Sequence, residues 1–141
     1  MLITIYIEEE ILQDKVTDVM SEIFFGQKGA IKFLREKLPS DVQTNALIDF
    51  SHRCAGFRLI VDLYINTFNT YEEVYPYIHV LSNVLQSRIF IDDSEHYGNL
   101  FVPDQPMKRA KFELTENEGE DDYLIILEVY DEGTSIPEDT L

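Results

Sequence analysis

Apolar and polar positions alternate most regularly near the middle of the chain. Every second side chain from Phe57 to Ile65 is apolar, a period of two that is typical of a strand with one buried face. Ala46, Ile48 and Phe50 keep the same spacing before a polar break that contains glycine. These runs predict a β-hairpin over residues 45–66, and we expect its second strand to be central in a sheet.

Two other elements precede this hairpin. Leu2 to Ile7 alternates like a short strand. Helical spacing begins at Glu8, where three glutamates suit the positive end of a helix dipole. A pair of glycines interrupts the pattern, and helical spacing resumes from Ala30 to Leu38. We therefore expect a broken or two-part helix that ends at a proline turn.

A second helix and another strand follow the hairpin. Thr70 and Glu73 have the spacing of a capping box in front of a helical apolar pattern. Pro76 lacks the N–H that an early helical bond needs, so we expect the first turn to be separate or kinked. Residues 88–92 then alternate as a short strand. The order predicts a ferredoxin-like β-α-β-β-α-β fold of the α+β class, an antiparallel sheet with both helices on one face.

The last third of the chain adds a further hairpin. Residues 92–107 hold prolines, a glycine and other turn formers, and predict a long connection. Two apolar runs follow, separated by the acidic segment 116–122. We expect one domain over residues 1–130 that includes this appended C-terminal β-hairpin, and a flexible acidic tail over residues 131–141.

The sheet face opposite the helices is expected to be too apolar to stay in water. Either the C-terminal hairpin folds over it, or a second subunit or another partner does. The side chains predicted on this outer face are those of Leu2, Tyr6, Leu47, Ile60, Tyr64 and Phe90.

Charge is distributed unevenly along the chain. The 27 acidic and 11 basic residues give a net charge of −16, which disfavours direct contact with nucleic acid and anionic membranes and favours a basic partner. Eleven of the acids lie between Phe112 and Leu141, a segment without lysine or arginine. This asymmetry indicates either an interaction surface or a device for solubility.

Cysteine content and the N-terminus bear on the compartment. The single cysteine, Cys54, cannot form a disulfide within the chain, and the first apolar run ends in glutamates long before the length of a membrane span. We expect a cytoplasmic, bacterial-type protein in a reducing setting.

Two groups of residues could carry chemistry near the hairpin turn. His52 and Cys54 could act as base and thiol nucleophile, although a structural cysteine explains the same residues. Arg53 and Arg58 could hold an anion or form salt bridges to surface acids. No catalytic or cofactor motif is present, so we expect a protein without enzymatic activity or a bound cofactor.

Two acidic groups are candidates for binding. Asp92, Asp93, Glu95 and His96 crowd a strand end, where they form either a solvated turn or a site for Mg²⁺, Mn²⁺ or Zn²⁺. The loop between the last two runs could steer a basic partner or be a solvated loop. Its acidic residues are Glu116, Glu118, Glu120, Asp121 and Asp122.

In its general character the chain resembles the small acidic immunity proteins of bacterial polymorphic and contact-dependent toxin systems. The likeness lies in the acidic balance, the α+β order and the segment RIFIDDSEHYGNLFVPD, which leads to an acidic C-terminal strand. The resemblance implies a protein that binds and inhibits a basic toxin domain, and it carries over no functional residue. We expect the partner to contact the two acidic groups together with Ile60 and Tyr64.

Three other hypotheses remain open. An acidic protein of this size could mimic DNA and inhibit a DNA-binding enzyme. A ferredoxin-like module could bind a small ligand or act as an enzyme through the residues around His52. A homodimer could form by closing the open sheet face.

Overall fold

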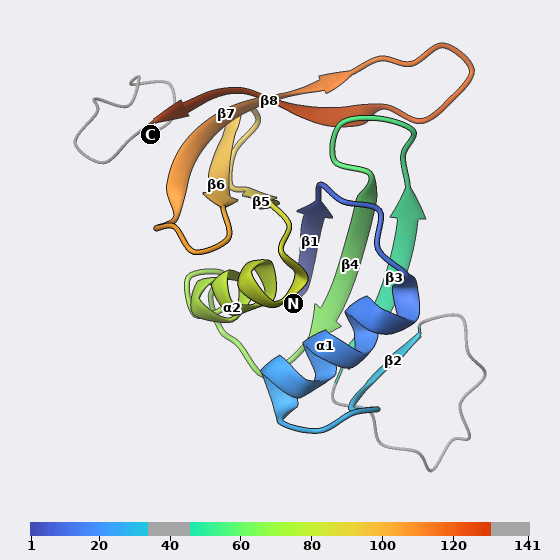
Figure 1. Ribbon diagram of the computed structural model, residues 1–141, viewed down its shortest axis with the longest axis vertical. Coiled ribbons are helices and arrows are strands. Elements are labelled where there is room, and N and C mark those ends of the chain that lie inside the picture. Colours follow the sequence, from blue (N-terminus) through green and yellow to red (C-terminus); the bar gives the residue numbers. More distant parts are fainter. Residues whose placement is uncertain (34–45, 131–141) are drawn as a thin grey trace.

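Residues 1–33 and 46–130 are described by the computed structural model, and they form an α+β protein with one eight-stranded mixed sheet and two helices (Figure 1). The elements are β1 (Leu2–Ile7), α1 (Gln13–Phe25), β2 (Ile31–Phe33), β3 (Ala46–His52), β4 (Leu59–Ile65), α2 (Tyr75–Leu85), β5 (Ile89–Asp92), β6 (Tyr97–Phe101), β7 (Lys108–Thr115) and β8 (Tyr123–Tyr130).

The strands lie in the order β2-β3-β4-β1-β5-β6-β7-β8. Only the pair β2–β3 is parallel among the pairs of the described residues. The predicted central hairpin is confirmed, because β3 and β4 pair antiparallel from Ala46 opposite Ile65 to His52 opposite Leu59. The other edge of β4 pairs with β1, which makes β4 an interior strand as expected.

Both helices pack on one face of the sheet. The spacing of Val16, Met20 and Phe24 gives α1 one apolar stripe, and Ile78 and Leu81 do the same for α2. These side chains meet the buried residues of β1, β3, β4 and β5 in the main hydrophobic core. The inward alternation predicted for β1 and β4 is confirmed, because the isoleucines of β1 are fully buried there.

The first helix begins later than the sequence predicted. Glu8 does not open a helix, because its amide donates to the carbonyl of Arg88 at 3.0 Å and its carboxylate forms an ion pair with the Arg88 guanidinium. Both contacts extend the pairing of β1 with β5 by one residue beyond the ends of the strands. The chain turns only after them, and α1 starts at Gln13.

The predicted second half of this helix is wrong where the structure describes it. Gly26 adopts a left-handed φ of 74° and ends α1, and Ile31 to Phe33 then extends as β2 along β3. Pairing with the free edge of β3 outweighs the helical spacing in this short stretch. Residues 34–38 of the predicted helix, the proline turn and the tail over residues 131–141 lie outside the described residues.

The predicted contact of Glu73 with Thr70 is present, but it closes the turn before α2, whose own N-cap, Val74, has no side-chain cap. A carboxylate oxygen of Glu73 accepts hydrogen bonds from the amides of Asn69 and Thr70, at 2.6 and 3.1 Å. This is the half of the capping box in which the acidic side chain reaches back. Pro76 lies in the first turn of α2, and a separate turn precedes the helix.

A strand occupies the segment that was predicted to be a long connection. All five residues of β6 are buried, so no alternation marks it in the sequence. Gly98 looks like a turn former, yet it lies within β6. Only glycine fits there, because a Cβ would overlap the Phe90 ring and the Ile91 carbonyl. With β2 and β6 added, the predicted ferredoxin-like order is not what this sheet shows, and the α+β class remains.

The C-terminal hairpin folds over one end of the outer sheet face. Figure 1 shows β7 and β8 as a long curved hairpin whose loop reaches the turn between β3 and β4. The Phe57 amide donates to the Leu124 carbonyl at 3.0 Å. A second hydrophobic cluster fills the space between these elements. Its buried members are Phe57, Phe90, Leu100, Ala110, Phe112 and Leu124.

The hairpin covers only part of the outer face. Ile60, predicted to face a partner, is 8% exposed, so it belongs to the covered end. Tyr64 and Leu2, which face each other across β4 and β1, remain 40% and 44% exposed. The outer face therefore has a covered end and an open end.

Leu124→Ala should lower the free energy of unfolding by about 2 to 5 kcal/mol, because it empties a fully buried position under the curled hairpin. Leu127→Ala on the same strand is the matched control, since Leu127 is 44% exposed and its loss should cost less than about 1 kcal/mol. Urea unfolding followed by circular dichroism measures both values. Equal costs would show that the hairpin does not cover the outer face in solution.

Gly56→Ala should destabilise the fold by more than about 2 kcal/mol, because a Cβ at Gly56 would overlap the Leu124 carbonyl oxygen and the residue has a φ of 62°. Gly119→Ala has a similar φ of 79° but open space around the new methyl group, so it should cost about 1 kcal/mol. Thermal unfolding of the two variants separates close approach from backbone strain. A similar loss in both would argue against a tight junction.

Candidate interaction surface

The open end of the outer face carries an apolar row beside an acidic row. Register places Leu47, Tyr64 and Leu2 opposite one another across β3, β4 and β1. Two residues along, the same three strands present Asp49, Asp62 and Thr4. Directly opposite residues of antiparallel strands project from the same face, so the two rows are neighbours. We call these six residues the outer-face patch.

Two carboxylates meet in the acidic row. Asp49 and Asp62 are directly opposite each other, a position where like charges are unfavourable. The Thr4 hydroxyl donates to Asp62 Oδ1 at 2.8 Å and holds that carboxylate in place. A cationic group placed between the two strands would interact favourably with both carboxylates, so the patch is chemically suited to a basic group.

The pKa of Tyr6 shows that carboxylates of two strands act on the same part of the outer face. Tyr6 lies on the same face of β1 as Thr4, next to the covered end. Burial raises the pKa of its hydroxyl, the charges of Asp92 and Asp62 raise it further, and Arg53 opposes them. Carboxylates from β4 and β5 therefore act at the same place on the outer face.

A cleft opens beside the patch, between β1 and β5. The two strands pair only at Tyr6 with Phe90 and at Ile7 with Ile89, although both continue beyond these residues. The cleft has a volume of about 520 Å³. It is lined by Leu2, Thr4, Tyr71, Ile91, Asp92, Asp93, Ser94 and Glu95.

The structure places the predicted acids after β5 on the rim of this cleft. Asp93 forms a bidentate ion pair with Arg109, whose Nη2 lies 3.2 Å from Asp93 Oδ1. No such cation is recorded for Asp92 or Glu95 among the described residues. Partial burial raises the pKa of the Asp92 carboxyl, its own backbone amide opposes the shift, and the Asp93 charge adds to it. Asp92 is thus an exposed residue whose carboxyl has a raised pKa and a like-charged neighbour.

The acidic loop between β7 and β8 is partly used to hold the fold together. Arg53 donates through Nε to the Asp122 carbonyl at 2.8 Å and lies 3.6 Å from the Asp121 carboxylate. Asn117 donates to Glu120 at 2.9 Å. The loop therefore anchors the hairpin to the turn after β3, and Arg53 is engaged in this role rather than free for an anion.

The loop acids and Tyr64 of the outer-face patch lie at opposite ends of β4. The loop meets the chain just before Leu59, whereas Tyr64 is near the other end of the strand, about 17 Å away at the rise of a strand. The sequence grouped Tyr64 with the acids of the loop and the acids after β5, and the structure brings it near the second group only.

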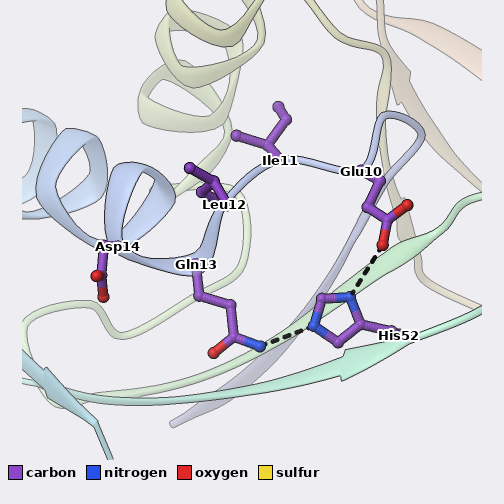
Figure 2. Close-up of a pocket in the computed structure, with 6 residues that line it drawn as sticks. All are labelled: Glu10, Ile11, Leu12, Gln13, Asp14 and His52. Carbon is purple, nitrogen blue, oxygen red and sulfur yellow. Dashed lines mark hydrogen bonds and ion pairs between the residues drawn. The ribbon is translucent and has the colours of Figure 1, made fainter.

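His52 and Cys54 do not form a nucleophile and base pair. Figure 2 shows His52 between Gln13, whose amide nitrogen donates to Nε2 at 2.7 Å, and Glu10, which lies 3.9 Å from Nδ1. Cys54 instead accepts a hydrogen bond from Asn117 Nδ2 at 3.0 Å. Each group has separate partners, so the geometry gives no activated thiol.

The histidine lines an open pocket of about 600 Å³ at the start of α1 (Figure 2). No sequence pattern reveals this pocket, because Glu10 and Gln13 are distant from His52 in the chain and meet it only in the folded protein. Leu12 lies beside it and is exposed. No serine, threonine or cysteine lies among the residues that line this pocket.

Metal binding finds no support in the part of the chain that the structure describes. There, no three or more His, Cys, Asp or Glu side chains come together in a way that could hold a metal ion. His96 lines a different pocket from Asp92 and Asp93, shared with β7 and Leu127, and Glu95 borders both pockets. The predicted group after β5 is therefore divided between two surfaces.

Comparison with models of known protein families, with curated proteins and with solved structures found no match to this chain. Among residues 1–33 and 46–130, neither helix has the length and apolar character needed to cross a membrane.

Asp92→Asn should stabilise the protein at pH 7 and have little effect near pH 3. The folded-state pKa of Asp92 is raised, so its ionised form costs stability above that pKa, and this cost disappears as the pH falls below the unfolded value. Urea unfolding at the two pH values measures the difference. A destabilised variant at pH 7 would mean that the Asp92 charge supports the fold.

Proposed function

We propose that this chain is a non-catalytic, acidic interaction protein that binds and inhibits a basic protein partner, in the manner of the immunity proteins it resembles. The observation that carries the proposal is the outer-face patch, where exposed Tyr64 and Leu2 adjoin the opposed carboxylates of Asp49 and Asp62. An apolar anchor beside concentrated charge is a common design for a protein interface.

Each half of the patch has a separate role in this proposal. Tyr64 supplies an aromatic anchor of large area and low conformational entropy, and Leu2 supplies apolar area beside it. The carboxylates attract and orient the basic partner, and the net charge of −16 raises the rate of encounter. Capping of a positively charged active cleft would inhibit a toxin that acts on nucleic acid, since that cleft must bind phosphates.

The test uses the basic proteins encoded beside the gene for this chain, each expressed alone and together with it in a bacterial host. A neighbour that arrests growth should be neutralised by co-expression, and the purified pair should form a complex measurable by calorimetry. If no neighbouring product is bound or neutralised, the proposal is wrong.

Two double variants remove the same amount of charge from different places. Asp49→Asn with Asp62→Asn should weaken the complex at least tenfold at low salt, because it discharges the outer-face patch. Glu116→Gln with Glu118→Gln, in the exposed loop, should change the affinity less than threefold. The opposite ranking would move the interface to the loop, and no effect of either would contradict an electrostatic complex.

Tyr64→Ala tests the apolar half of the patch. The variant should lose binding by a faster dissociation rate, whereas the aspartate variants should mainly slow association. Surface plasmon resonance at two salt concentrations separates these effects.

A further inference from the structure

The ladder between β1 and β5 ends while both strands continue. Tyr6 with Phe90 is the last pair. The same register would next place Ile5 opposite Ile91 and Thr4 opposite Asp92, and neither pair forms. β1 extends four more residues to Leu2. At the rise of a strand this unpaired length is about 13 Å, enough to lie along roughly four residues of extended chain.

The backbone of β1 faces into the cleft at alternate residues. The Ile65 amide donates to the Met1 carbonyl at 2.9 Å, so Met1, Ile3 and Ile5 direct their backbone groups toward β4. Leu2 and Thr4 therefore direct theirs to the other side, toward β5. The Leu2 carbonyl accepts a hydrogen bond from the Tyr71 hydroxyl at 3.0 Å, which is a side-chain contact in place of a strand partner.

The negative charge around this edge of β1 favours a basic occupant. Asp92 and Glu95 line the cleft. Asp62 of β4 accepts a hydrogen bond from Thr4 of β1, and both lie on the outer face. Alternate side chains of a strand laid beside β1 would project onto that outer face next to these carboxylates. The remaining side chains would project toward Ile91 and the main core, where apolar groups fit.

We infer that the cleft between β1 and β5 takes an extended basic segment of the partner as an added strand along β1. Lysine or arginine at alternate positions faces the acids, and backbone hydrogen bonds form with Leu2 and Thr4. This is recognition by strand addition, in which the main chain supplies affinity and alternate side chains supply specificity. The inference rests on the proposed function and names the part of the partner that is bound.

The raised pKa of Asp92 agrees with this occupant. Its carboxyl has a raised pKa from partial burial and from Asp93. A nearby ammonium group would favour the ionised form, so occupation of the cleft should lower the pKa of Asp92.

The probe is a fluorescent pentapeptide of sequence Val-Lys-Val-Lys-Val with blocked ends, titrated with the full chain at low salt. Two further peptides carry N-methyl groups on the odd or on the even residues, which block hydrogen bonding along one edge each and leave charge unchanged. The unmodified peptide should bind, and only one methylated peptide should retain binding within threefold. Equal binding of both would indicate simple electrostatic adsorption and overturn the inference, as would no binding of the unmodified peptide.

Variants of the chain locate the peptide. Asp92→Asn with Glu95→Gln should weaken peptide binding at least fivefold, and Glu116→Gln with Glu118→Gln, which removes equal charge, should change it less than twofold. Amide chemical shifts should move most at Leu2 to Ile5 and at Asp92. Shifts confined to other strands would overturn the inference.

These outcomes are separable from those of the proposed function. A basic partner that is neutralised through Asp49 and Asp62, together with a peptide that does not bind, would remove strand addition alone. A peptide that binds the cleft, with no basic neighbour bound, would remove the proposed function and leave the cleft as a strand-binding site.

Discussion

The contact between β8 and the turn after β3 determines which part of the outer sheet face is covered and which part stays open. Phe57 donates to Leu124, and Gly56 allows the two backbones to approach. Because β4 and β8 are far apart in the strand order, the sheet must curl to make this contact. The curl turns one end of the outer face into a second hydrophobic cluster and leaves the other end open.

Charge follows the same division. At the covered end, Arg53 joins the acidic loop to the turn, so part of the C-terminal charge stabilises the junction. At the open end, Asp49 and Asp62 oppose each other, and Asp92 lies near them across β1. Carboxylates gathered on one part of the outer face favour the binding of a basic partner.

Part of this surface could be predicted from the sequence. The period of two placed Tyr64 on the outer face, and the acids after β5 stood out by their spacing. Asp62 alternates with the core residues of β4 in the same way, so the pattern also places Asp62 on the outer face. Only the pairing of β3 with β4 brings Asp49 opposite Asp62. The loop acids were equally conspicuous, but nothing in their spacing showed that Arg53 would engage two of them.

The sequence by itself determined the local elements whose side chains have a regular environment: the central hairpin, β1, the apolar stripe of α2 and the C-terminal hairpin. Only the tertiary structure decided where β1 and β5 separate, how far the last hairpin covers the outer face, and that residues 31–33 and 97–101 are strands. These features depend on contacts between residues distant in the chain. β6 is buried on both faces and β2 is three residues long, so neither has a period that local patterning could reveal.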